Sequence, residues 1–219
     1  MTLLEAFTVT LICFGWAIFS SLEAVAAWSA IDAAAGASTA SADTFSDGSM
    51  ISLIIIELIM ATIALAFLTS RSYDIRSLLP SPSSNGLVIG AGLYAMALAI
   101  FWVLGPLLQH GAAEPIQAMV QGATVSVPTV LVTAIVNGTY EEVFLLGFLA
   151  RGLERFGTSI ALGAPLLIRL LYHLYQGPVA ATFVCFVGLL WGLYYLRSGR
   201  LFPVVCAHIL SDTVPFLWH

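Results

Sequence analysis

Long apolar runs alternate with short polar segments along the whole chain. The runs lie near residues 6–28, 50–70, 86–108, 128–150, 160–176, 179–196 and 201–217. An α-helix needs about 20 apolar residues to cross the hydrocarbon core of a bilayer, and most of the runs approach that length. The pattern therefore predicts an all-α, polytopic transmembrane helix bundle with about seven spans, or eight if a re-entrant or split helix is present.

Two polar segments interrupt the pattern in the N-terminal half. Residues 33–49 are rich in alanine, serine, threonine and aspartate, and residues 70–86 contain prolines, an asparagine and a glycine, a composition typical of loops. The fifth run is short and contains Pro165, so its start is difficult to place from sequence. No internal repeat and no soluble segment is evident, and we predict a single membrane domain over residues 1–219.

Composition strengthens the membrane interpretation. Of the 219 residues, 60% are hydrophobic and only 9% are charged, and the mean hydropathy is +0.99. Charged residues usually make up about a quarter of a soluble domain, so a soluble fold could not bury this much apolar surface. The net charge of −5 provides no basic surface for nucleic acid.

The remaining compositional signals are weak. The three cysteines, Cys13, Cys185 and Cys206, lie in apolar stretches without metal-ligand spacing, and we expect small buried side chains rather than disulfides or zinc ligands. Residues 11–19 could form the apolar core of a signal peptide, but the segment before them contains Glu5 and no basic residue. We therefore expect the first run to be a retained helix.

The arginines predict an orientation. Six of the seven follow the second, fourth and sixth runs, in the pairs Arg71 and Arg76, Arg151 and Arg155, and Arg197 and Arg200. With seven spans these three segments lie on one side of the membrane, and the acidic segment with Asp32, Asp43 and Asp47 lies on the other. The positive-inside rule then places the N-terminus in the cytoplasm and the C-terminus outside.

Ionisable residues lie inside three apolar runs, where they are costly. The fourth run contains adjacent glutamates, the fifth an arginine and a histidine one turn apart, and the seventh a histidine and an aspartate on one helix face: Glu141, Glu142, Arg169, His173, His208 and Asp212. Each ionised group costs about 2.5–3.5 kcal/mol at mid-membrane. They are tolerable only if they face the bundle interior and satisfy one another.

This set can be interpreted in two ways. Carboxylates on one helix and histidines on two others supply a general base, proton carriers and hydrogen-bond donors. Adjacent helical residues point about 100° apart, so one glutamate should face substrate while the other makes a structural contact. The alternative is a polar cluster that only holds the helices together. Isolated Glu23 and Glu57 could line a cavity, snorkel or bridge helices, and His110 and His219 receive no role.

Three motifs in order resemble the CPBP family, the CAAX prenyl endopeptidase type 2, bacteriocin-processing and immunity, and abortive-infection-type intramembrane proteases. The motifs are Glu141-Glu142, Tyr172-His173-Leu174-Tyr175-Gln176-Gly177 and His208-Ile209-Leu210-Ser211-Asp212. The resemblance covers residues 128–216, which it identifies as the catalytic core. Residues 1–127 match only in being hydrophobic and would supply N-terminal transmembrane helices.

The resemblance implies a role for each matching residue. Glu141 would activate the attacking water with support from Glu142, and His173 would assist proton transfer or hold the water. His208 and Asp212 would stabilise the oxyanion. The family's chemistry requires no metal, so no cofactor is expected. Sequence leaves zinc open, because Glu141, His173 and His208 could ligate zinc with an open fourth position.

Two positions depart from the family pattern. The first motif usually has an arginine four residues after its second glutamate, and this chain has Leu146 there. The second usually has a phenylalanine four residues before its histidine, and this chain has Arg169. A buried guanidinium needs an acidic partner. We therefore predict that Arg169 replaces the missing arginine and pairs with Glu142. The alternative is that Arg169 snorkels to an interface or that the site has decayed.

The sequence thus favours an intramembrane endopeptidase that hydrolyses a peptide or membrane-anchored protein with glutamate-activated water. The alternative is a catalytically inactive relative that serves as a binding or scaffolding subunit in a membrane complex. The alanine-rich, lysine-free composition suggests the inner membrane of a bacterium. The expected partners are membrane lipids and a peptide or membrane-protein substrate.

Overall fold

The computed structural model describes residues 1–34, 44–108 and 114–217, and the side chains of 29–34 lie outside that description. Within these residues the regular structure is helical, apart from one isolated bridge between Ser46 and Thr124. The long helices are α1 (Leu3–Ala34), α2 (Asp47–Ser70), α3 (Ser84–Leu108), α5 (Val127–Glu142), α7 (Thr158–His173), α8 (Pro178–Ser198) and α9 (Phe202–Leu217). The shorter elements are η1 (Ile75–Leu78), α4 (Pro115–Gln121), η2 (Val143–Ala150), α6 (Arg151–Leu153), η3 (Glu154–Phe156) and η4 (Leu174–Gln176).

These elements confirm the predicted all-α membrane bundle. Six helical stretches are long and apolar enough to cross a bilayer, among them the continuous stretch from α5 through η3, Val127–Phe156. The seventh predicted span, α9, is a shorter apolar helix. The fifth span begins at Thr158 and passes through Pro165 without ending. His110 and His219, which received no role, lie outside the described residues.

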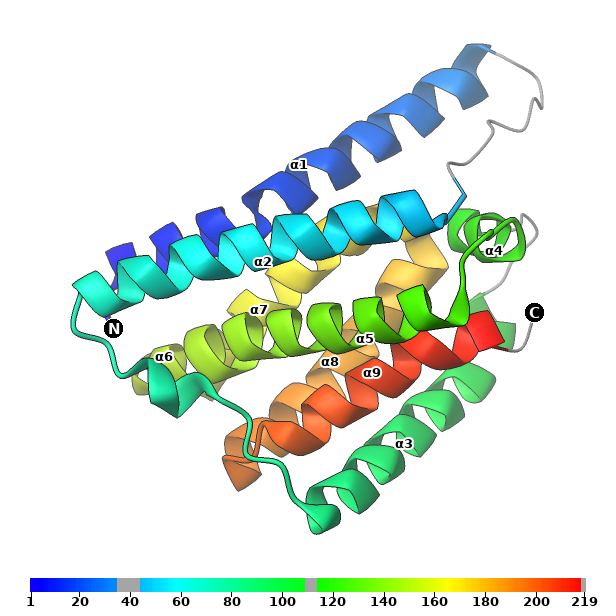
Figure 1. Ribbon diagram of the computed structural model, residues 1–219. Coiled ribbons are helices and arrows are strands. Elements are labelled where there is room, and N and C mark those ends of the chain that lie inside the picture. The colour runs from blue at the N-terminus through cyan, green and yellow to red at the C-terminus, as the bar shows by residue number, and fades with distance from the viewer. Residues whose placement is uncertain (35–43, 109–113, 218–219) are drawn as a thin grey trace.

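Helix α9 lies inside the bundle, between α3 and α5, as Figure 1 shows. Helix α2 packs on α5, and α7 packs against both α1 and α8. Gly90 of α3 permits the close approach of α9, because a β-carbon there would lie 2.6 Å from Cβ of Cys206. Helix α9 is thereby held between α3 and α5, and α5 carries the two glutamates.

The outer surface is apolar, and the buried core runs through the middle of the bundle. Leucine, isoleucine and tryptophan side chains are exposed on α1, α2 and α3, with Leu4 at 72% and Trp102 at 74% of their full accessible area. In contrast, Leu145 and Phe148 of η2 are fully buried. A bilayer would solvate that exposed surface. The chain is an integral membrane protein.

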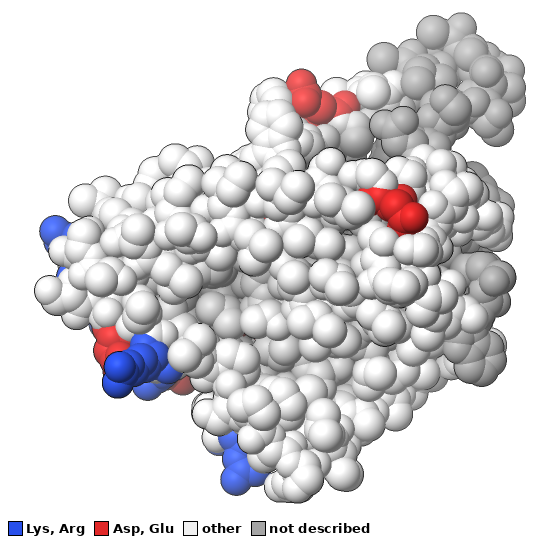
Figure 2. Space-filling model, viewed as in Figure 1, with Lys and Arg blue, Asp and Glu red and all other residues white. Residues whose placement is uncertain are grey.

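The face of the bundle seen in Figure 2 has few charged side chains. The visible arginines lie at the end of the bundle where Figure 1 places the N-terminus, together with some acidic side chains, and a wide uncharged band separates this end from the other Asp and Glu side chains in view. The start of α1 and the end of α9 lie at opposite ends of the bundle.

Candidate active site

The site is built around Glu142, the last residue of α5. Its side chain is completely buried, and its Oε1 accepts a hydrogen bond of 2.6 Å from Nη2 of Arg169 on α7. The predicted ion pair is therefore present. Directly after Glu142 the chain forms the π-helix η2, a distortion that often accompanies functional sites. The buried carboxylate and the buried guanidinium compensate each other.

His208 of α9 connects this ion pair to the rest of the site. Its Nδ1 lies 2.7 Å from the same Oε1 of Glu142. Because that carboxylate is paired with a guanidinium, it is an ionised acceptor, and Nδ1 is the donor. The His208 ring packs against Trp191 of α8 with centroids 5.3 Å apart, and the Arg169 guanidinium lies 5.7 Å from the centre of the same indole. The imidazole is thus fixed in position, and its Nδ1 carries a hydrogen.

Glu141 makes a different set of contacts, as expected for adjacent helical residues. Its Oε2 accepts a short hydrogen bond from the hydroxyl group of Tyr172 and lies 3.9 Å from Nε2 of His208. The Tyr172 ring stacks on Phe14 of α1 with centroids 5.4 Å apart. Only 6% of Glu141 is exposed, so its carboxylate lies in a largely dry environment.

Asp212 lies one turn beyond His208 and is the more accessible end of the site. Its Oδ2 is 3.5 Å from Nε2 of His208, and its side chain is 31% exposed. The side-chain amide of Asn137, one turn before Glu141 on α5, donates to the same Oδ2 at 2.8 Å. Nε2 of His208 therefore faces two carboxylates, those of Glu141 and Asp212.

His173 lies at the end of α7 and is half-buried. Its Nδ1 is 2.9 Å from the backbone carbonyl oxygen of Arg169. A carbonyl oxygen can only accept, so Nδ1 is the donor and Nε2 is the ring nitrogen that could accept a proton. The ring lies against Tyr172 with centroids 4.4 Å apart.

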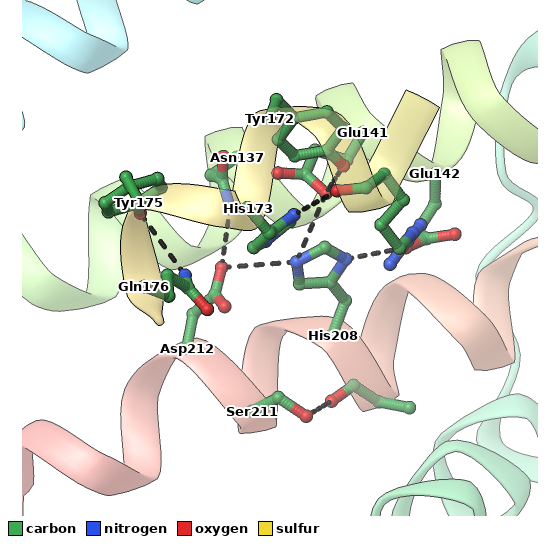
Figure 3. Close-up of polar contacts among 12 residues, drawn as sticks. Asn137, Glu141, Glu142, Tyr172, His173, Tyr175, Gln176, His208, Ser211 and Asp212 are labelled. Atoms are coloured by element: carbon green, nitrogen blue, oxygen red, sulfur yellow. Dashed lines mark hydrogen bonds and ion pairs between the residues drawn. The ribbon is translucent and has the colours of Figure 1, made fainter. Parts of the chain in front are cut away.

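The structure thus brings the sequence-predicted residues together from α5, α7 and α9, and Figure 3 shows Glu141, Glu142, His173 and Asp212 around the His208 ring. Two participants were missed: Asn137 and Tyr172. Tyr172 stands beside a motif histidine, and Asn137 is one turn from Glu141, but neither residue type is unusual in an apolar helix. Glu57 of α2, for which cavity-lining, snorkelling and helix-bridging roles were left open, is buried. Glu23, the other isolated glutamate, is exposed on α1.

The three donors that lie within 4.8 Å of one another are those of Glu141, Glu142 and His208. His173, which the sequence suggested as a ligand, is outside this group. The Glu142 oxygen nearest to His208 is already bonded to Arg169 at 2.6 Å and to Nδ1 of His208 at 2.7 Å. A guanidinium in contact with this Oε1 opposes a divalent cation at that oxygen, whereas Oε2 of Glu142 is buried without a hydrogen-bond partner among the described residues.

This geometry can be compared with known protein families. Residues 123–214 match the family model of the type II CAAX prenyl endopeptidase Rce1-like proteins. The match confirms the family resemblance drawn from the glutamate and histidine motifs. The Rce1-like region runs from the segment before α5 into α9, and it includes the glutamate pair, Arg169, both histidines and Asp212. Helices α1 to α4 lie outside it. No curated protein and no solved structure matches the chain.

Proposed function

We propose that this protein is an intramembrane endopeptidase in which Glu141 activates a water molecule. The observation that carries the proposal is the position of Glu141: a buried carboxylate beside an imidazole that a second, charge-compensated carboxylate holds in place. The match to an endopeptidase family supports the reaction class. A cluster that served only to join helices would not need two adjacent glutamates with separate partners.

Glu141 would act as the general base. Tyr172 and His208 both face its Oε2, so Oε1 is the oxygen that would take a proton from water. The resulting hydroxide attacks the carbonyl carbon of the scissile peptide bond and forms a tetrahedral oxyanion. Glu141 then returns the proton to the amide nitrogen, the C–N bond breaks, and an acid and an amine leave. Tyr172 fixes the carboxylate for both transfers.

His208 would stabilise the oxyanion. Glu142 accepts from Nδ1, and the Glu141 and Asp212 carboxylates face Nε2, an arrangement that favours the doubly protonated imidazolium. Its Nε2–H can then donate to the developing negative charge. Asp212 as an ionised carboxylate has no donor of its own, so it would act by holding the charge on His208. His173 would assist proton transfer through Nε2.

No step of this reaction requires a metal ion, and we propose that activity needs none. We also propose that the protein resides in a bacterial inner membrane with its N-terminus in the cytoplasm, because the arginine-bearing segments lie at the N-terminal end of the bundle. The substrate would be a peptide or a membrane-anchored protein that reaches the site from within or beside the bilayer.

The reaction can be tested with purified protein in lipid nanodiscs and a library of membrane peptides in ¹⁸O-labelled water. We expect new peptide termini by mass spectrometry, each with one ¹⁸O atom in its carboxyl group, and equal yields with and without EDTA. Dependence on a metal would overturn the metal-free mechanism. The absence of products, together with a stable co-purifying membrane protein, would favour the inactive-subunit alternative.

Replacing Tyr172 with phenylalanine should slow cleavage without unfolding the protein. The change removes only the hydroxyl group that donates to Glu141. A hydrogen bond to a charged group contributes about 1.5–3 kcal/mol, so kcat should fall by about tenfold to a hundredfold, with KM little changed. Tyr175→Phe is the matched control, because the Tyr175 hydroxyl accepts a bond only from Gln176 within the described residues. Equal rates for the two variants would refute the role given to Tyr172.

A further inference from the structure

Glu57 is a buried carboxylate that the mechanism above does not use. It lies in the middle of α2, outside the Rce1-like region, and only 6% of the residue is exposed. Its Oε2 is buried and has no hydrogen-bond partner among the described residues. A buried polar atom without a partner is costly. Such an atom in the interior of the bundle points to a ligand that supplies the missing donor.

The helix geometry places Glu57 at the level of the site. Asp47, the first residue of α2, accepts hydrogen bonds from the backbone amide and hydroxyl group of Ser126, the residue before α5. The two packed helices therefore start together. Glu57 follows Asp47 by ten residues and Asn137 follows Val127 by ten, so each lies about 15 Å along its helix.

Electrostatics agree with this position. Glu57 is close enough to Glu141, Asp212 and His208 to interact with the charge of each. Helix α2 thus contributes a further buried carboxylate at the level of the site. The site is built from both halves of the chain.

The charges in this space do not balance. Arg169 compensates Glu142, and Nε2 of His208 already faces the carboxylates of Glu141 and Asp212. Buried charges are stable when they are paired. The described residues provide no further cation next to Glu57, so an incoming positive charge would find both a charge partner and a hydrogen-bond acceptor there.

We propose that Glu57 binds a positively charged side chain of the substrate, and that the enzyme prefers peptides with a basic residue close to the scissile bond. The preference rests on the proposed peptidase function and deepens it. Glu57 is thus assigned as a specificity-determining residue contributed by the N-terminal half. Glu141 and His208 perform the reaction, and Glu57 selects what is placed beside them.

The test uses two libraries of apolar peptides that are identical except at one varied position, which holds arginine in one and the uncharged isostere citrulline in the other. We expect wild type to cleave the arginine library about tenfold to a hundredfold more efficiently than the citrulline library. This factor corresponds to the free energy of one charge-assisted hydrogen bond. Glu57→Gln, which keeps the shape of the side chain, should bring the ratio close to one. Glu23→Gln, on an exposed glutamate of α1, should leave the ratio as in wild type.

The outcomes separate this proposal from the proposed function. If Glu57→Gln still cleaves the arginine library more efficiently than the citrulline library by the wild-type ratio, the assignment of Glu57 is wrong. The assignment is also wrong if wild type cleaves both libraries equally well. If wild type cleaves neither library, the peptidase proposal fails, and binding of the same peptides in nanodiscs is measured instead by fluorescence anisotropy. Tighter binding of arginine peptides that depends on Glu57 supports the cation site without proteolysis, and its absence refutes it.

Discussion

Arg169→Leu should destabilise the folded protein by about 3–5 kcal/mol, because it leaves Glu142 buried and uncompensated. The Glu142 side chain has no exposed surface, and the 2.6 Å contact with Arg169 is the ion pair that offsets its charge. The same change should remove peptidase activity, since Glu142 holds the His208 ring through Nδ1. Unfolding free energy in detergent and cleavage rate at a temperature where the variant is folded measure the two effects separately.

Arg71→Leu is the matched control for this prediction. Arg71 also pairs with a glutamate, Glu5, at 3.1 Å, but more than half of the Arg71 side chain is exposed. Exposed ion pairs contribute little, so this variant should fold and cleave like wild type. An equal loss of stability in both variants would mean that removing any arginine from this protein is harmful, and the argument from burial would fail.

The double variant Leu146→Arg with Arg169→Phe should recover much of what Arg169→Leu loses. It restores the arginine and the phenylalanine at the positions where the family motifs have them. Position 146 is one turn after Glu142, so an arginine there can reach the same carboxylate from its own helix. A phenylalanine at 169 can fill the space beside Trp191. A double variant no more stable than Arg169→Leu would contradict the view that the cation has moved between helices.

The membrane helices were predictable because a helix that crosses a bilayer needs a long run of apolar residues. Each of the seven runs coincides with a helical stretch, and most boundaries agree to within three residues. The larger differences have physical causes. Helix α1 continues to Ala34, since alanine is a strong helix former in any solvent. Helix α4 has only seven residues, too few for a periodic pattern to be recognisable.

The ion pair at the centre of the site was also predictable, because a buried charge without a partner costs free energy and not because of any hydrophobic pattern. A guanidinium inside an apolar run must have an acidic partner nearby, and Glu142 had lost its own motif arginine. Nothing comparable identifies Asn137 or Tyr172, because neutral polar residues can be buried with many kinds of partner. The π-helix after Glu142 has no sequence signal either.

The position of Glu57 relative to the site could not be predicted from the motifs. From the sequence it could line a cavity, snorkel or bridge helices, because its neighbours across the bundle could not be known from the residues around it. The contact between Asp47 and Ser126 supplies the missing information, since it sets the register of α2 against α5. Long-range register of this kind depends on loop contacts that the apolar periodicity does not encode.

Glu141→Gln should abolish cleavage while the protein remains folded. The amide keeps the size of the side chain and can still accept a hydrogen bond from Tyr172, but it cannot take a proton from water. Loss of a general base lowers the rate by about a hundredfold to ten-thousandfold. Glu142→Gln provides the contrast: it leaves Arg169 without its charge partner, so this variant should lose stability as well as activity.

The most direct test of the proposed mechanism is the single-turnover cleavage rate of Glu141→Gln on a peptide that wild type cleaves. Wild type is assayed in parallel, and the unfolding free energies of the two proteins are measured to show that they are equally stable. We predict a rate at least about a hundredfold below wild type, with peptide binding retained. A Glu141→Gln protein that cleaves at the wild-type rate would show that the glutamate does not activate the water.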